Sequence, residues 1–146
     1  MSRSAPPKVR HADGWLTAME SGRRTREPAK ASIVRKLQAR GAAVTVAPFA
    51  TRWEPLLDEV DGVVLTNGPG DPADLMPLVE RVRTVLARGL PVLGICLGHQ
   101  LVALAAGART YKLPYGHRSQ NQPVMDVVTR HAYVTSQNHG YAVDDR

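Results

Sequence analysis

The sequence has a single cysteine, Cys96, so no disulfide can form within the chain and no cysteine-based metal cluster can be built. No apolar run approaches the roughly 20 residues that cross a bilayer. The N-terminus has neither the apolar core nor the cleavage pattern of a secretory signal. The Gly-x-x-x-x-Gly-Lys-Ser/Thr pattern that binds nucleotide phosphates is also missing. We therefore expect a cytoplasmic chain with no metal, no membrane contact and no ATP site of its own.

Basic residues outnumber acidic ones only at the front of the chain. Residues 1–40 carry ten Lys or Arg and three Asp or Glu, whereas residues 41–146 carry nine and ten. The net charge of +6 thus arises at the front, where no aromatic platform for stacking bases accompanies it. We expect a solvated basic segment and no specific nucleic-acid partner.

Residues 1–28 differ from the rest because proline, glycine and clustered arginine punctuate them heavily. This composition predicts a poorly ordered basic segment, with no strand and at most a short helical turn near residues 15–19. The expected domain comprises residues 29–146.

Hydrophobic periodicity in that domain predicts alternating helices and strands. Helices are expected at 29–40, 53–60, 74–88 and 97–106, and strands at 43–47, 63–66 and 90–95. The alternation indicates an α/β fold, with a three-layer, mostly parallel sheet and crossover helices. Beyond the last helix we expect a short strand at 109–112, a polar loop at 116–123 and a hairpin of strands 124–128 and 131–135.

Cys96 falls where the apolar strand 90–95 meets the predicted helix 97–106. A strand that turns sharply into a helix at a nucleophile is an elbow, and it aims the helix N-terminus at that side chain. The N–H groups there favour a thiolate and can hold an oxyanion, while Gly94 and Gly98 suit the close packing of such a turn. The alternative is a buried cysteine with a structural role only.

A glycine-rich loop, residues 67–72, follows another predicted strand. Within it Asp71 suits a helix N-cap and Pro72 the first helical position. The carboxyl ends of parallel strands meet at one edge of a sheet, so we expect this loop and Cys96 to be neighbours.

Four stretches, 67–72, 94–101, 112–124 and 136–144, together resemble the class I (triad) glutamine amidotransferase domain over residues 30–144. Within that family they are most similar to the branch that forms the small chain of carbamoyl-phosphate synthetase. The resemblance implies a cytoplasmic glutaminase that feeds ammonia to a large synthetase chain for pyrimidine and arginine synthesis. ATP and magnesium would belong to that partner.

The resemblance also implies a mechanism and a set of site residues. Cys96 would attack the carboxamide of L-glutamine, release ammonia and form a γ-glutamyl thioester that water hydrolyses. The N–H groups of Leu97 and the glycine-rich loop would hold the oxyanion. The glutamine-binding positions of the family match Gly68, Gly70, Leu97, Gln100, Asn138, Gly140 and Tyr141.

Two departures from the family bear on function. The family completes its triad with a downstream His-Pro-Glu segment, which this sequence lacks, and His139 does not match that base. The family domain also opens with an apolar strand, whereas residues 20–28 are polar. These departures predict a truncated domain, incomplete at both ends, with a sheet that lacks its first strand. Its function is then either glutamine hydrolysis or, as an alternative, glutamine or partner binding without turnover. A third possibility, an amidotransferase serving anthranilate or nucleotide synthesis, is disfavoured by the motifs at 116–118 and 136–141.

Overall fold

The computed structural model describes residues 15–19, 31–48 and 51–144. In chain order its elements are β1 (Trp15–Met19), α1 (Ala31–Gln38), β2 (Val44–Pro48), η1 (Leu56–Asp58), β3 (Gly62–Leu65), η2 (Pro72–Leu75), α2 (Met76–Ala87), β4 (Val92–Gly94), α3 (Leu97–Ala105), β5 (Thr110–Met125) and β6 (Ala132–Val143). The predicted α/β alternation is confirmed. No helix in the described part of the chain is long and apolar enough to cross a bilayer.

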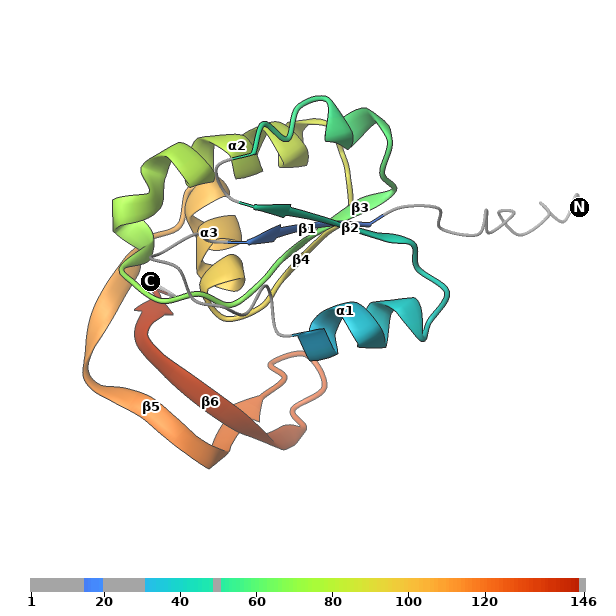
Figure 1. The fold of residues 1–146 in the computed structure, drawn as a ribbon. Helices are drawn as coiled ribbons and strands as arrows, with labels where there is room; N and C mark the ends of the chain where they lie inside the picture. The colour runs from blue at the N-terminus through green and yellow to red at the C-terminus, as the bar shows by residue number, and fades with distance from the viewer. Residues whose placement is uncertain (1–14, 20–30, 49–50, 145–146) are drawn as a thin grey trace, which may run out of the picture.

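A parallel four-stranded sheet in the order β2-β1-β3-β4 forms the centre of the fold. The connection through α1 steps outward from β1, and the connection through α2 steps outward from β3 in the other direction. Because such crossovers are right-handed, opposite steps place their helices on opposite faces of the sheet. Figure 1 shows this arrangement, with α1 on one side of the sheet and α2 on the other. The carboxyl ends of β3 and β4 lie side by side, as a shared active edge requires.

The core lies between β3 and the helices α2 and α3. All four residues of β3 are buried, in keeping with a strand that is covered on both faces. Its partners are the inward side chains of α2 and of the helix that follows Cys96: Leu78, Val79, Val82, Val85, Leu97 and Leu101. Leu75 at the end of η2 and Leu86 in α2 pack against this core and are only partly buried.

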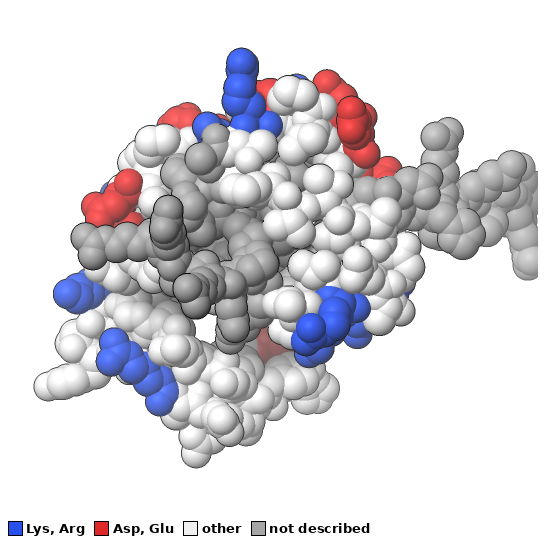
Figure 2. Space-filling model, in the orientation of Figure 1, with Lys and Arg blue, Asp and Glu red and all other residues white. Residues whose placement is uncertain are grey.

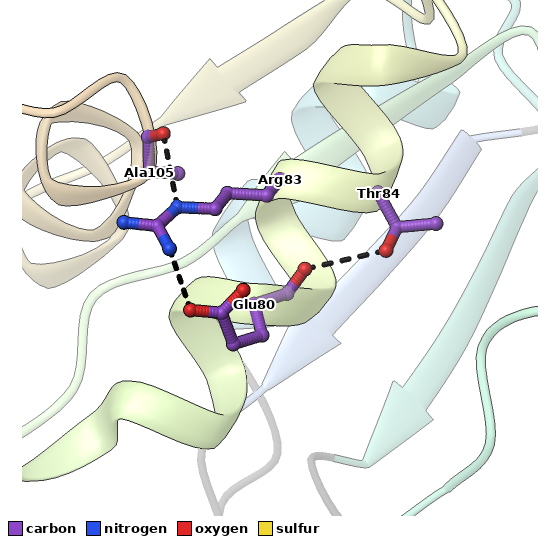
Figure 3. A network of polar contacts seen from close by, with 4 residues as sticks. All are labelled: Glu80, Arg83, Thr84 and Ala105. Carbon is purple, nitrogen blue, oxygen red and sulfur yellow. Dashed lines mark hydrogen bonds and ion pairs between the residues drawn. The ribbon is translucent and has the colours of Figure 1, made fainter.

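Arg83 joins α2 to the C-terminal end of α3 (Figure 3). Its Nε donates to the carbonyl oxygen of Ala105 across 3.3 Å, and its Nη1 pairs with Glu80 at 2.6 Å. The last carbonyls of a helix lack partners within the helix and carry partial negative charge, so a guanidinium suits this position. The contact ties the helix that begins beside Cys96 to its neighbour.

The strand β1 corrects the expectation for the front of the chain. Residues 15–19 form a central strand, paired with β2 on one side and β3 on the other, in place of a helical turn. The prediction that the sheet lacks its first strand is therefore wrong. The apolar character of this short stretch suits a central parallel strand, but the proline, glycine and arginine around it masked the signal. Residues 1–14 and 20–28 lie outside the described residues, so their expected low order stays a prediction.

Two further expectations are wrong. The helix predicted at 53–60 is only the 3-10 turn η1, and the loop predicted at 116–123 lies within the long strand β5. β5 pairs with β6 as an antiparallel hairpin whose register shifts between Lys112 and His117 and between Ser119 and Gln122. This stretch is a strand because its backbone pairs with β6, although its side chains are polar, do not alternate with apolar ones and predict no strand.

The hairpin of β5 and β6 leaves several large apolar side chains exposed. Its exposed apolar side chains include Tyr115, Val128 and Val134, which are 89%, 87% and 73% accessible. In Figure 2 the acidic side chains gather toward the top, the region where α2 lies in Figure 1, and the hairpin region carries few charged groups.

Candidate functional site

Cys96 occupies a strained turn between β4 and α3. Its φ of 53° and ψ of −110° lie outside the regions that L-residues ordinarily adopt. The backbone is held there from both sides, since Ile95 N–H donates to Leu65 O across 2.9 Å and Gly98 N–H donates to Ile95 O across 3.0 Å. The strand, strained residue and helix reproduce the elbow that the sequence predicts, and such strain persists at functional sites where the surroundings over-determine it.

The elbow can form only because the residues two positions before and two positions after Cys96 are glycines. A Cβ on Gly98 would lie 2.1 Å from Leu65 O, and one on Gly94 would lie 2.6 Å from the backbone of His99. The helix N-terminus is therefore pressed directly against β3. The close packing predicted for Gly94 and Gly98 is confirmed.

The thiol faces the last strand of the chain. Cys96 Sγ lies 3.9 Å from the carbonyl oxygen of Asn138 in β6, and the cysteine is partly exposed. Leu97 opens α3, where the first N–H groups of a helix have no acceptor within it. A partly exposed thiol beside such donors has the surroundings that a nucleophile and its oxyanion need.

Gln100 links the same helix to β6. It lies one turn beyond Cys96, on the same side of α3, and is 6% exposed. Its Nε2 donates to the carbonyl oxygen of Tyr141 across 2.7 Å. Of the predicted site residues, the structure thus brings Cys96, Gln100, Asn138 and Tyr141 together.

The glycine-rich loop reaches this cluster through Asp71. The Asp71 carboxylate caps η2 by accepting from Ala73 N–H at 2.9 Å, as predicted, and also accepts from the Tyr141 hydroxyl. Partial burial raises the pKa of Tyr141, and its hydrogen bond to Asp71 together with the negative charges of Asp71 and Asp74 acts in the same direction. The loop after β3 and the end of β6 are therefore neighbours.

Four further residues were predicted to bind glutamine, and each could offer only its backbone to a ligand. Gly70 is exposed with a φ of 106°, which favours glycine, while Gly68 and Gly140 are half-buried. Leu97 is a core residue that offers only its backbone. The assignment of these four positions to glutamine binding stays a prediction.

Sequence reasoning missed a polar network on β6. Gln137 Oε1 lies 2.9 Å from His139 Nε2 and 3.0 Å from His117 Nδ1, and His139 Nδ1 lies 2.7 Å from Tyr141 O. The sequence carries a signal for this network. Thr135, Gln137, His139 and Tyr141 are alternate residues, which lie on one face of a strand. The predicted strand 131–135 ends at Thr135, whereas β6 continues to Val143 and carries the other three residues.

The described residues contain no group of three His, Cys, Asp or Glu side chains placed to hold a metal ion. The expectation of a metal-free chain stays a prediction. Among these residues the hydrogen-bond partner of the Cys96 thiol is the carbonyl oxygen of Asn138 and not a histidine ring.

Comparison with protein families and known proteins agrees with this geometry. The family described as glutamine amidotransferase class-I matches residues 27–146. The carbamoyl phosphate synthase small chain of Symbiobacterium thermophilum is 57% identical over 145 residues, which is 98% of this chain and 38% of the relative. The arginine-specific small chain of Bacillus subtilis is 48% identical over 117 residues, 80% of this chain and 33% of the relative. The chain thus spans about a third of the length of these relatives.

Solved structures show the same fold. A glutamine amidotransferase from Thermotoga maritima aligns with a TM-score of 0.70 at 20% identity, over 92% of this chain and 64% of its own. A glutamine amidotransferase from Methylobacillus flagellatus aligns with a TM-score of 0.69 at 18% identity, over 92% and 57%. The predicted three-layer α/β architecture is confirmed, and the described fold is part of that larger domain.

Proposed function

Because this chain belongs to the class I glutamine amidotransferase family, we propose that it carries the glutamine-hydrolysing site of a carbamoyl phosphate synthase small chain. The observation that supports the proposal most strongly is the strained elbow at Cys96, with its thiol facing Asn138 and with Gln100 holding Tyr141. The family match and the small-chain relatives support the same chemistry.

The proposed reaction begins with attack by Cys96 Sγ on the carboxamide carbon of L-glutamine. A C–S bond forms, and the carbonyl oxygen becomes an oxyanion that the N–H of Leu97 and the loop containing Gly68 and Gly70 stabilise. The C–N bond then breaks, the thiol proton passes to the leaving nitrogen, and ammonia departs. Water hydrolyses the γ-glutamyl thioester, which yields glutamate and restores the thiol.

The substrate's other end requires hydrogen-bond partners for an α-amino and an α-carboxyl group. In the proposal the side chain of Gln100 and the backbone of Asn138, Gly140 and Tyr141 meet this need, since they line the same edge as the thiol. Backbone and amide groups provide both donors and acceptors without a competing charge.

The proton transfer needs a general base. His139 cannot serve in this arrangement, because its two ring nitrogens already face Tyr141 O and Gln137 Oε1. The base in this proposal comes from outside the described residues. A large synthetase chain, with ATP and magnesium bound to it, would receive the ammonia for pyrimidine or arginine synthesis.

The direct test measures ammonia release from L-glutamine by the purified chain, alone and with a large synthetase chain. Cys96→Ser is the matched variant, since it keeps the size of the side chain and removes the thiol. Turnover that disappears in Cys96→Ser supports the proposal. Turnover that survives in Cys96→Ser contradicts it.

A second function, glutamine binding without turnover, is favoured by one observation: among the described residues the Cys96 thiol is hydrogen-bonded to the carbonyl oxygen of Asn138 and not to a general base. A diazoketone analogue of L-glutamine distinguishes the two. Stoichiometric labelling of Cys96 without ammonia release, in the presence of the large chain, indicates a binding module. Labelling together with Cys96-dependent ammonia release indicates the enzyme.

A further inference from the structure

The side chain of Gln137 is the centre of a polar chain on one face of β6. Its Nε2 donates to Thr135 Oγ1 across 3.0 Å, and its Oε1 faces His139 Nε2 at 2.9 Å and His117 Nδ1 at 3.0 Å. The two rings meet edge to face, with centroids 5.0 Å apart. Gln137 is therefore the one side chain that contacts all the other members of this group.

The direction of the hydrogen bonds can be followed from one end of the chain to the other. The Thr135 hydroxyl donates to the carbonyl oxygen of Gln122 across 2.9 Å, so its oxygen is left to accept from Gln137. At the far end the carbonyl oxygen of Tyr141 can only accept, and His139 Nδ1 lies 2.7 Å from it. His139 must therefore carry a proton on Nδ1.

With Nδ1 protonated, His139 Nε2 has two possible states. It carries a second proton and donates to Gln137 Oε1, or it carries a lone pair and accepts from the Gln137 NH₂. The second state requires that the amide turn over and that the Thr135 hydroxyl donate to Oε1 in place of Gln122 O. A primary amide suits both states because its donor and acceptor occupy nearly the same space. Either way the Nδ1–H bond to Tyr141 O is kept.

The Tyr141 carbonyl is thus held from two sides. Gln100 Nε2 donates to it from the helix that follows Cys96, and His139 Nδ1 donates to it from its own strand. Asn138, whose carbonyl faces the Cys96 thiol, is the neighbour of His139 in the same strand. A change at Gln137 that frees the His139 ring would loosen this segment without touching the thiol.

We propose that Gln137 is a positioning residue of the glutamine site. It fixes the orientation of the His139 ring, so that Nδ1 faces Tyr141 O and holds this carbonyl together with Gln100. The proposal deepens the proposed function and rests on it only in naming L-glutamine as the ligand.

The ring state of His139 is measured by ¹⁵N NMR of the imidazole at about pH 8, where a free histidine is neutral. The variants are Gln137→Leu, which removes both amide groups, and Gln120→Leu, a matched change at an exposed glutamine of β5. We expect the Nδ1–H form in wild type and in Gln120→Leu, and a mixture of tautomers in Gln137→Leu. An Nε2–H ring in wild type, or an unchanged ring in Gln137→Leu, would overturn the proposal.

The affinity for L-glutamine provides the second readout. Gln137→Leu should weaken the Kd by about tenfold, on the order of one lost hydrogen bond, whereas Gln120→Leu should not change it. Gln137→Glu keeps the size of the side chain and an acceptor facing His139 Nε2, so it should retain most of the affinity. An unchanged Kd in Gln137→Leu overturns the proposal.

The two readouts separate this inference from the proposed function. If the folded wild-type chain binds no L-glutamine, the proposed function fails, while the NMR measurement still decides whether Gln137 fixes the His139 ring. If wild type binds L-glutamine and Gln137→Leu binds it equally well, the proposed function stands and this inference fails.

Discussion

The side-chain amide of Gln100 donates a hydrogen bond to the backbone carbonyl of Tyr141 across 2.7 Å. The two residues lie 41 positions apart in the sequence, on the elbow helix and on the final strand. Together with the approach of Cys96 Sγ to Asn138 O, this bond places the C-terminal hairpin against the nucleophile. The site is thus assembled from two parts of the structure: the elbow with its helix α3, and the hairpin of β5 and β6.

Replacing Gln100 should weaken this connection. Gln100→Leu removes the donor from a largely buried position, so we expect the free energy of unfolding to fall by about 1–2 kcal/mol. Urea denaturation measures the change. Gln38→Leu, at an exposed glutamine of α1, is the control and should change stability by less than about 0.5 kcal/mol. Equal effects of the two substitutions would argue against a role for the Gln100–Tyr141 bond.

A methyl group at the elbow should be poorly tolerated. Gly98→Ala places a Cβ 2.1 Å from Leu65 O, so α3 must move away from β3, and we expect a loss of about 1–3 kcal/mol in unfolding free energy. Gly140→Ala is a steric control, because a Cβ there meets no atom within 4 Å. Thermal unfolding in which the two variants behave alike would contradict the packing described for the elbow.

The tyrosine beside Asp71 should make stability depend on pH in the alkaline range. The pKa of Tyr141 is raised in the folded chain, so its contribution to stability is present below the unfolded pKa of about 10 and is lost as the pH rises through the folded value. Tyr141→Phe should remove this dependence. Urea unfolding of both proteins between about pH 8 and pH 11 gives the difference, and parallel curves would contradict the Asp71 contact.

Asp126, in the turn between β5 and β6, should make stability depend on pH in the acid range, and with the opposite sign to Tyr141. Backbone N–H groups of Thr129 and Val128 donate to Asp126 and hold its pKa below the ordinary value. Its contribution to stability is therefore present above the unfolded pKa of about 4 and is lost as the pH falls through the folded value. Asp126→Asn keeps an acceptor and removes the charge. Its stability should decline less steeply than that of wild type in acid-range unfolding, and an equally steep decline would count against the turn as described.

The sequence predicts well those parts of the fold in which local signals and burial agree. The strand 63–66 and the helix 74–88 follow from continuous or periodic apolar residues, and Asp71 and Pro72 mark the start of the helical segment that leads into α2. The elbow at Cys96 could be foreseen because a short apolar strand, two glycines and an apolar helix surround it. Tertiary packing and local preference coincide in these elements.

The sequence predicts poorly those strands whose side chains show no strand pattern and whose place is decided by backbone pairing with other segments. β1 is five residues long and is set among prolines, glycines and arginines, so its place between two other strands is decided by long-range pairing. β5 contains polar residues and register shifts, and its partner begins after the turn that Asp126 closes. The network around Gln137 depends on that pairing and was hidden for the same reason.

The most direct measurement of the central claim is labelling of Cys96 by a diazoketone analogue of L-glutamine, followed by mass spectrometry of the intact chain and its peptides. The account predicts one label per chain on Cys96, protection by L-glutamine but not by L-glutamate at equal concentration, and slower labelling in Gln100→Leu. Labelling at other residues, or labelling of Cys96 that L-glutamine does not slow in a folded chain, would contradict the assignment of this site.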